Sequence, residues 1–269
     1  VFDEIINGFR LALGGAQEYY GVEADMVAYG KIIGGGLPIG IYAGKAEFMD
    51  RIDGGCLENR GAAKMVVQTG GTFCHHPLTL EASKAVLQYL LKDNGRLQKR
   101  LNYKTKTMAD FINSIFEEYN IPLHISVGGS QFIISSEDGT LMRMLYYLLV
   151  YHEIYIWEGG TCYLSSVHTD EDILCLVRTV ISSLKELTDN KCFEFGSQFC
   201  ECNIDEKLED LKTRLQYDDE DISCLNVKDR EKAYQFVQQE EVEYVLPVTP
   251  MQHMVLTSNI CARRDCTDV

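Results

Sequence analysis

The sequence predicts an α/β fold, and three observations along the 269-residue chain carry this prediction. Short apolar runs that end near glycine, such as Met26–Tyr29, are typical of buried strands. From residue 77 onward, apolar residues recur at helical spacing over two long segments. Two further runs, 123–127 and 131–135, flank a Gly-Gly pair, which indicates a strand hairpin. Strands and helices therefore follow one another along the chain, as in mixed α/β proteins.

Composition excludes several classes of function. The net charge of −15 argues against nucleic acid or an anionic membrane as a partner. No apolar run approaches the length of a membrane span. Hydrophobic residues make up 46% and charged residues 24%, which is the mix of a soluble globular protein. The ten cysteines include no Cys-x-x-Cys pair, so we expect reduced thiols in a cytoplasmic protein and no metal site.

Lys31 is the first candidate site residue. It follows the apolar run 26–29 and precedes the triple glycine 34–36. A lysine at a strand end among glycines suits a Schiff base with an aldehyde, because partial desolvation lowers the pKa of its amine and glycines allow close approach. The alternative is a surface lysine in a glycine-rich turn.

Asp3 is the second candidate. Val1-Phe2 is interpreted as the end of a buried strand that carries Asp3 at its carboxyl end. Ligands in open α/β sheets bind at the carboxyl ends of strands, where Lys31 is also expected. A carboxylate there can keep the ring nitrogen of pyridoxal phosphate protonated, so that the ring accepts electrons. The alternative is that Asp3 caps a helix beginning at Glu4.

Longer motifs extend this pattern to a family. Residues 2–10 (FDEIINGFR), 13–17 (LGGAQ) and 30–40 (GKIIGGGLPIG) resemble class III aminotransferases, nearest the glutamate-1-semialdehyde aminomutase branch. Residues 69–77 (TGGTFCHHP) and 155–159 (YIWEG) look like the aminotransferase domains embedded in hybrid polyketide and nonribosomal peptide synthetases. The resemblance covers roughly residues 1–188. It implies part of a fold-type-I transferase that uses pyridoxal 5′-phosphate (PLP).

The resemblance also implies roles for three residues. Lys31 would form the internal aldimine with PLP and then move the proton between the substrate carbon and the cofactor carbon. Asp3 would pair with the pyridinium nitrogen. Thr72 would donate a hydrogen bond to the cofactor phosphate, usually across a dimer interface, although its local pattern alone fits an ordinary turn hydroxyl.

The chain divides into five parts by this interpretation. Residues 1–76 form the back half of the large, mixed-sheet PLP-binding domain, and 77–122 form connecting helices. Residues 123–188 form the small α+β carboxyl-terminal domain. An acidic linker follows over 189–243, where sixteen acidic side chains oppose seven basic ones. Residues 244–269 open like the condensation domain of a nonribosomal peptide synthetase.

The element predictions follow from spacing and caps. Strands are expected at 39–43, 123–127, 131–135, 154–157 and 162–165, and helices at 45–49, 77–90, 95–119, 141–152, 169–187 and 205–215.

Several polar residues have open interpretations. The pair His75-His76 either lies near a substrate tunnel or belongs to a loop before Pro77. His168 is assigned a capping or packing role. Arg10 is the nearest candidate for binding a substrate carboxylate, and Glu158 lies where the family has a substrate-facing loop.

The implied reaction has two halves. An amino acid donor gives its amino group to the cofactor, which then aminates the β-keto group of a carrier-protein-bound acyl chain, in a homodimeric enzyme. One alternative is a glutamate-1-semialdehyde 2,1-aminomutase-like enzyme. Another is a non-catalytic dimerisation or linker fragment, because the family's phosphate loop and ring-stacking aromatic are not among these residues. We therefore expect a fragment of a longer chain.

Overall fold

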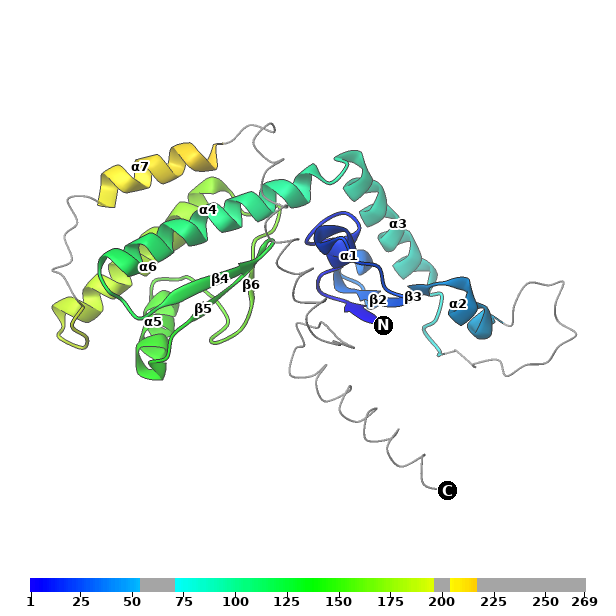
Figure 1. Ribbon diagram of the computed structural model, residues 1–269, viewed down its shortest axis with the longest axis horizontal. Helices are drawn as coiled ribbons and strands as arrows, with labels where there is room; N and C mark the ends of the chain where they lie inside the picture. Colours follow the sequence, from blue (N-terminus) through cyan, green and yellow to red (C-terminus); the bar gives the residue numbers. More distant parts are fainter. Residues whose placement is uncertain (54–70, 196–203, 217–269) are drawn as a thin grey trace, which may run out of the picture.

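The computed structural model describes residues 1–53, 71–195 and 204–216. It has two lobes, each built on a three-stranded sheet, and a long helix leads from the first lobe into the second (Figure 1). The predicted mixed α/β architecture is confirmed. Most of the predicted acidic linker and the condensation-like segment 244–269 lie outside the described residues.

The first sheet has the order β1-β2-β3. Strand β1 (Phe2–Glu4) is parallel to β2 (Met26–Gly30), and β3 (Gly40–Gly44) is antiparallel to β2. Helix α1 (Gly15–Tyr20) lies between the two parallel strands in the chain. The 3-10 turn η1 (Lys31–Gly34) begins the connection that reverses the chain between β2 and β3.

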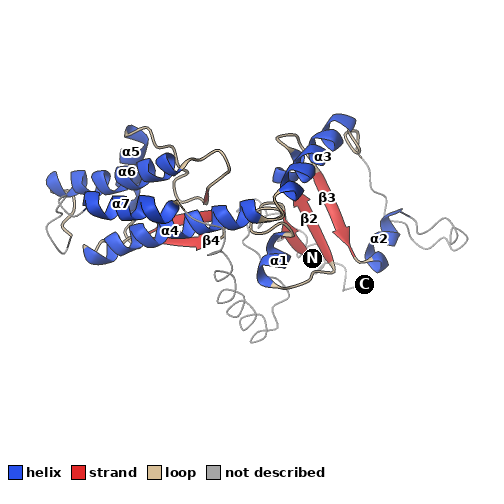
Figure 2. Cartoon of the chain, turned by 90° about the horizontal axis from the view of Figure 1, so that it is seen from above, coloured by secondary structure: helices blue, strands red, loops and turns tan. Residues whose placement is uncertain are grey.

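Two helices lead from the first lobe to the second. After α2 (Ala46–Asp53), helix α3 (Pro77–Lys92) begins with proline at its first turn, where the missing N–H is tolerated. Helix α3 packs against η1, and α4 (Arg96–Glu118) then runs into the second lobe (Figure 2). Both helices occupy the segments that apolar spacing predicted.

The second sheet has the order β4-β5-β6 and is antiparallel throughout. Its hairpin consists of β4 (His124–Gly128) and β5 (Gln131–Ser135), and Gly129 has the positive φ of 66° that a tight turn requires. Strand β6 (Cys162–Tyr163) pairs with the start of β5. The main core joins this sheet to α4, α5 (Gly139–Tyr151) and α6 (Asp170–Asp189).

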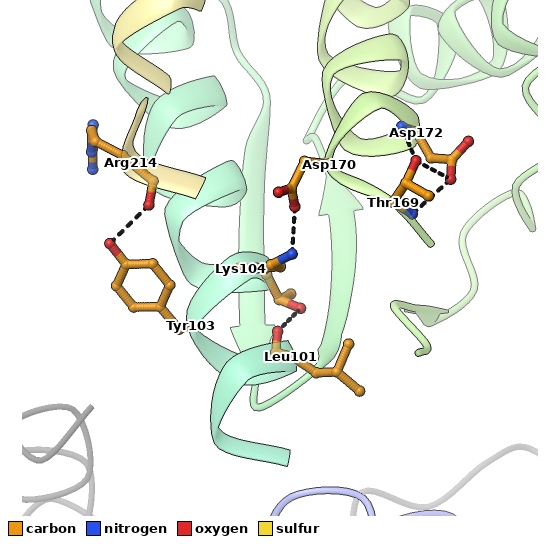
Figure 3. Close-up of polar contacts among 8 residues, drawn as sticks. Leu101, Tyr103, Lys104, Thr169, Asp170, Asp172 and Arg214 are labelled. Atoms are coloured by element: carbon orange, nitrogen blue, oxygen red, sulfur yellow. Dashed lines mark hydrogen bonds and ion pairs between the residues drawn. The ribbon is translucent and has the colours of Figure 1, made fainter. Parts of the chain in front are cut away.

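Polar contacts fix the start of α6 (Figure 3). Thr169 and Asp172 form the capping box that the sequence predicted, which satisfies backbone N–H groups at the helix start. Lys104 of α4 forms an ion pair with Asp170, a pair that is largely shielded from water. These contacts tie the beginning of α6 to α4.

Helix α7 (Ile204–Leu215) packs on α4 and α6, although it falls within the segment predicted as a linker. Its buried side chains, at helical spacing, are Ile204, Leu208, Leu211 and Leu215. The Tyr103 hydroxyl also donates to the Arg214 carbonyl at 3.2 Å (Figure 3). The helix predicted at 205–215 is therefore confirmed, but the acidic composition of the segment did not indicate that its apolar face packs on the second lobe.

The predicted strand at 154–157 is wrong. The segment is not a β-strand and pairs with none of the described strands. Ile154 and Ile156 are half-buried, whereas Tyr155 and Trp157 are 88% and 62% exposed. The alternation of the two isoleucines with Tyr155 and Trp157 showed which side of the segment faces the core. A β-strand, however, also needs a neighbouring strand for its backbone hydrogen bonds.

No helix in the described parts of the chain is long and apolar enough to cross a bilayer.

Candidate functional site

Asp3 lies in β1, and Lys31 begins η1 directly after β2, the parallel neighbour of β1. Asp3 lies opposite Ala28 in the β1–β2 register, and Lys31 directly follows the last residue of β2. Both residues therefore lie at the same, carboxyl-terminal edge of the first sheet, as the sequence predicted. In α/β proteins, this edge is where ligands bind.

Lys31 has a strained backbone. Its φ of 50° lies in the left-handed region, which non-glycine residues rarely adopt, and its side chain is exposed. Such strain persists only where surrounding packing imposes it, and it concentrates at functional sites. Within the described residues, the Lys31 amine has no hydrogen bond or ion pair, so it is accessible for reaction.

Two glycines that follow Lys31, Gly34 and Gly35, are closely packed. A Cβ atom at Gly34 would lie 3.0 Å from Ile39, and one at Gly35 would lie 3.0 Å from Val86 of α3. Gly35 also has a φ of 59°. The turn therefore lies between Ile39, which precedes β3, and Val86 of α3. Side chains at Gly34 and Gly35 would collide with these two residues.

Asp3 is fixed by a local turn. One of its carboxylate oxygens accepts a hydrogen bond from the backbone N–H of Ile5 at 3.0 Å, and the residue is half-buried. This Asx-type contact holds the carboxylate at the strand end. The open alternative, a helix beginning at Glu4, does not occur, because β1 extends through Glu4 and turns follow it.

Glu4 is a supporting residue that the sequence reasoning did not single out. It is 1% exposed, and its carboxylate accepts hydrogen bonds from the backbone N–H groups of Ala16 at 2.7 Å and Gln17 at 3.1 Å. Burial raises the pKa of Glu4 above its ordinary value, although these donors act in the opposite direction. A Cβ at Gly15 would lie 2.0 Å from a Glu4 oxygen. The sequence signal that could have indicated this contact is the Asp3-Glu4 pair followed by the Gly-Gly pair at 14–15.

Arg10 is engaged with the second lobe, so it is not a free anchor for a substrate carboxylate. Its Nη1 donates to Ser130 Oγ at 3.2 Å and to the Leu164 carbonyl at 3.0 Å. Its guanidinium carbon lies 4.9 Å from the centre of the Tyr163 ring. Burial lowers the pKa of Arg10 below its ordinary value, while Tyr163 acts in the opposite direction.

Thr72 lies on an exposed turn before α3, together with His75 and His76. None of the contacts within the described residues joins Thr72 to Asp3 or Lys31. His76 is the N-cap residue of α3 but makes no side-chain cap, which agrees with the loop interpretation of the histidine pair.

The second lobe contains a separate groove of about 410 Å³. Tyr155, Trp157 and His168 are among its lining residues, and neither Asp3 nor Lys31 lines it. His168 Nδ1 accepts a hydrogen bond from the Ser165 backbone at 3.0 Å, which is a packing role. Glu158 is exposed beside this groove and lies 3.6 Å from Arg143.

The residues at the first-sheet edge fit PLP. The Asp3 carboxylate can accept a hydrogen bond from a protonated ring nitrogen, and the accessible Lys31 amine can act as a nucleophile toward an aldehyde. Cβ atoms at Gly36 and Gly40 would have no atom within 4 Å, so the turn leaves an open surface for a flat ligand.

Known proteins resemble the chain in both sequence and fold. Residues 1–149 match the family described as aminotransferase class-III. The glutamate-1-semialdehyde 2,1-aminomutase of Ruminiclostridium cellulolyticum is 33% identical over 201 residues, which cover 69% of this chain and 44% of that protein. The chain spans less than half the length of such curated relatives.

Solved structures of transaminases share the fold of this chain. An omega-transaminase from Sphaerobacter thermophilus superimposes with a TM-score of 0.60 at 26% identity, over 70% of this chain and 44% of its own. A transaminase with PLP bound gives a TM-score of 0.59 at 22% identity, over 70% of this chain and 44% of that one, which shows the shared fold. The predicted fold class, part of a fold-type-I PLP transferase, is confirmed.

Proposed function

The chain belongs to the class III aminotransferase family, and we propose that it forms the lysine-bearing part of a PLP-dependent aminotransferase. The observation that carries this proposal is that Asp3 lies in β1 and that Lys31 directly follows β2, the adjacent parallel strand. A surface lysine in a plain turn would require neither the strained φ of 50° nor the close packing of the following glycines.

The chain's own residues divide the chemistry between them. PLP, when bound, supplies an aldehyde for amines and a ring that withdraws electrons from the reacting carbon. The Lys31 amine would hold the cofactor covalently, and as a free amine it would remove and return the substrate proton as a general base. The Asp3 carboxylate keeps the ring nitrogen protonated, because a negative charge there favours the charged form.

Thr72 is assigned the phosphate contact across a homodimer interface. In this proposal, its exposed hydroxyl serves a cofactor held by a second copy of the chain. The exposure of Thr72 and of the neighbouring Phe73, which is 83% exposed, supports a role outside the single chain.

The proposed substrates are an amino acid donor and a carrier-protein-bound β-ketoacyl chain, in a cytoplasmic polyketide/nonribosomal peptide synthetase. This finer proposal rests on sequence motifs at 69–77 and 155–159, and on the condensation-like opening at 244–252. Its product would be a β-amino acyl chain that a condensation domain could extend.

The second candidate is a glutamate-1-semialdehyde 2,1-aminomutase-like activity. It is favoured by relatives of that name, which are 33% to 40% identical to this chain over the matched residues. The two candidates differ in substrate, since the aminomutase acts on a free small molecule. Turnover of a β-ketoacyl carrier protein, with none of glutamate-1-semialdehyde, would support the assembly-line proposal, and the reverse result would support the second candidate.

The first experiment adds PLP to the purified chain and records the visible absorption of the protein after dialysis. Lys31→Ala is the test variant. Lys45→Ala is the matched control, because Lys45 lies in the same lobe and is exposed like Lys31, but it is paired with Asp25 at 2.5 Å. Borohydride reduction and peptide mass spectrometry then locate the attached cofactor.

We expect a retained band and a label on Lys31 in the wild type and in the control, and neither in Lys31→Ala. A label on another lysine would refute the assignment of Lys31. A folded wild type that retains no band would instead support the non-catalytic fragment, and the activity would then require residues outside this chain.

A further inference from the structure

The loop of residues 5–11, directly after β1, the strand that carries Asp3, connects the first lobe to the second. Arg10 contacts three neighbouring positions of the second lobe: Ser130, just before β5, and Tyr163 and Leu164, at the end of β6. Its partners are 120 to 154 residues away in the chain. One guanidinium therefore joins two strands of the second sheet to the loop that follows β1.

Asn7 makes a second connection to the same sheet. Its side-chain oxygen accepts a hydrogen bond from Gln131 Nε2 at 2.7 Å, and Asn7 is 6% exposed. Gln131 is the first residue of β5, next to the Arg10 partner Ser130. The two contacts are therefore adjacent on the second lobe and three residues apart on the loop.

Helix α4 holds the other side of the loop. Gln98 donates to the Phe9 carbonyl at 3.0 Å, and Asn102 donates to the Leu11 carbonyl at 2.7 Å. A Cβ at Gly129 would lie 2.4 Å from the Leu11 side chain, so the hairpin turn approaches the loop closely. The loop is thus fixed by both the sheet and the long helix of the second lobe.

The loop is also short and rigid at the Asp3 end. The Gly8 N–H donates to the Glu4 carbonyl at 2.8 Å, and the Ile5 N–H donates to the Asp3 carboxylate. Phe9 has a positive φ of 62°, and its ring lies 5.3 Å from that of Tyr29 in β2. A displacement of the loop would therefore reach the Asp3 carboxylate within a few residues.

We propose that Asn7, Arg10, Ser130, Gln131 and Tyr163 form an interlobe lock, which fixes the strand end carrying Asp3 relative to the second lobe. Arg10 is its central positioning residue, and it acts on the cofactor site through the loop rather than by touching substrate. The structural part of this inference stands on the contacts alone, whereas its effect on cofactor binding rests on the proposed function.

Arginine suits this position for a physical reason. A planar guanidinium can stack on the Tyr163 ring while its N–H groups donate hydrogen bonds in the plane of the guanidinium. The ammonium group of a lysine cannot do both. Arg10→Lys therefore retains the charge and loses the stacking geometry. Tyr163→Leu removes the aromatic face but leaves the Arg10 hydrogen-bond partners.

The experiment compares Arg10→Ala, Arg10→Lys and Tyr163→Leu with wild type, using the full chain. Arg178→Ala is the matched control, because Arg178 is an exposed arginine of the second lobe that lies 4.0 Å from the Glu171 carboxylate and forms no contact in the lock. Hydrogen exchange followed by mass spectrometry is measured without cofactor. A PLP titration by visible absorption then gives the cofactor affinity of each variant.

In Arg10→Ala, we expect exchange on the order of tenfold faster in the loop 5–11 and in 128–135 together with 162–165, since a charged hydrogen bond is lost. The core peptides of α5 and α6 should exchange as in wild type. The cofactor dissociation constant should rise by about tenfold. Arg10→Lys and Tyr163→Leu should give intermediate effects in the same peptides, and the control should give none.

Two results would overturn the lock. Unchanged exchange in these peptides would show that Arg10 does not hold the lobes together. Unchanged cofactor affinity with a raised Michaelis constant for the amino donor would show direct substrate binding by Arg10. If wild type binds no PLP, the exchange result still decides the lock, so its failure and that of the proposed function are distinguishable.

Discussion

Helix α7 offers the sharpest stability test, because the sequence predicted a helix within a linker, whereas the structure packs this helix on the second lobe. Leu211 is completely buried against the core that includes α4 and α6. Its truncation in Leu211→Ala removes three carbon atoms from that contact and leaves a cavity. At comparable buried positions, a Leu→Ala substitution lowers the free energy of unfolding by roughly 2.7–5 kcal/mol.

For Leu211→Ala we expect the free energy of unfolding to fall by about 3 kcal/mol. This value is near the lower end of the range, because a helix at the edge of the core can shift to fill part of the cavity. For a domain of this size, that loss corresponds to a drop in Tm on the order of 10 °C. Denaturant unfolding followed by circular dichroism gives the free energy, and scanning calorimetry gives the Tm of the second lobe.

Glu209→Ala is the matched control, since Glu209 is an exposed residue of the same helix. Its effect should stay within about 0.5 kcal/mol. If Leu211→Ala were as mild as this control, α7 would not be docked in solution, and the interpretation of residues 204–215 as part of the linker would stand.

Three further outcomes are expected. Gly35→Ala should destabilise the first lobe by roughly 1–2 kcal/mol and weaken PLP binding, because its φ is 59° and Val86 is close, whereas Gly40→Ala should be near neutral in both assays. Thr169→Ala should lose about 1 kcal/mol in denaturant unfolding through loss of the α6 capping box. Glu4 has a raised pKa in the folded chain, so the folded state binds more protons and loses stability as pH rises from the unfolded value through the folded one. The stability advantage of wild type over Glu4→Gln should therefore be largest below about pH 4.5 and shrink as the pH rises toward 7, and a difference that does not change with pH would contradict the raised pKa of Glu4.

The site and the lock together suggest how the two lobes cooperate. Asp3 and Lys31 lie on the first sheet, while the contacts of the loop 5–11 lie mostly on the second. A cofactor held between two strand ends is sensitive to small shifts of either strand, since catalytic groups need their geometry within fractions of an ångström. The polar contacts between lobes are consistent with that requirement.

The sequence by itself determined the elements whose signals are local. Helical spacing located α3 and α4, Pro77 and the Thr169 capping box marked helix starts, and the Gly-Gly pair marked the β4–β5 hairpin. It also predicted that Asp3 and Lys31 end neighbouring strands. Such signals are readable because periodicity, caps and turn glycines act within a few residues.

Only the tertiary structure decided which groups meet across the chain. It left 154–157 outside the sheet, docked α7 on the second lobe, and engaged Arg10 with residues more than a hundred positions away. It also buried Glu4 beneath the start of α1. A sequence pattern shows which face of an element is apolar or charged, but the partner of that face is set by packing between distant segments.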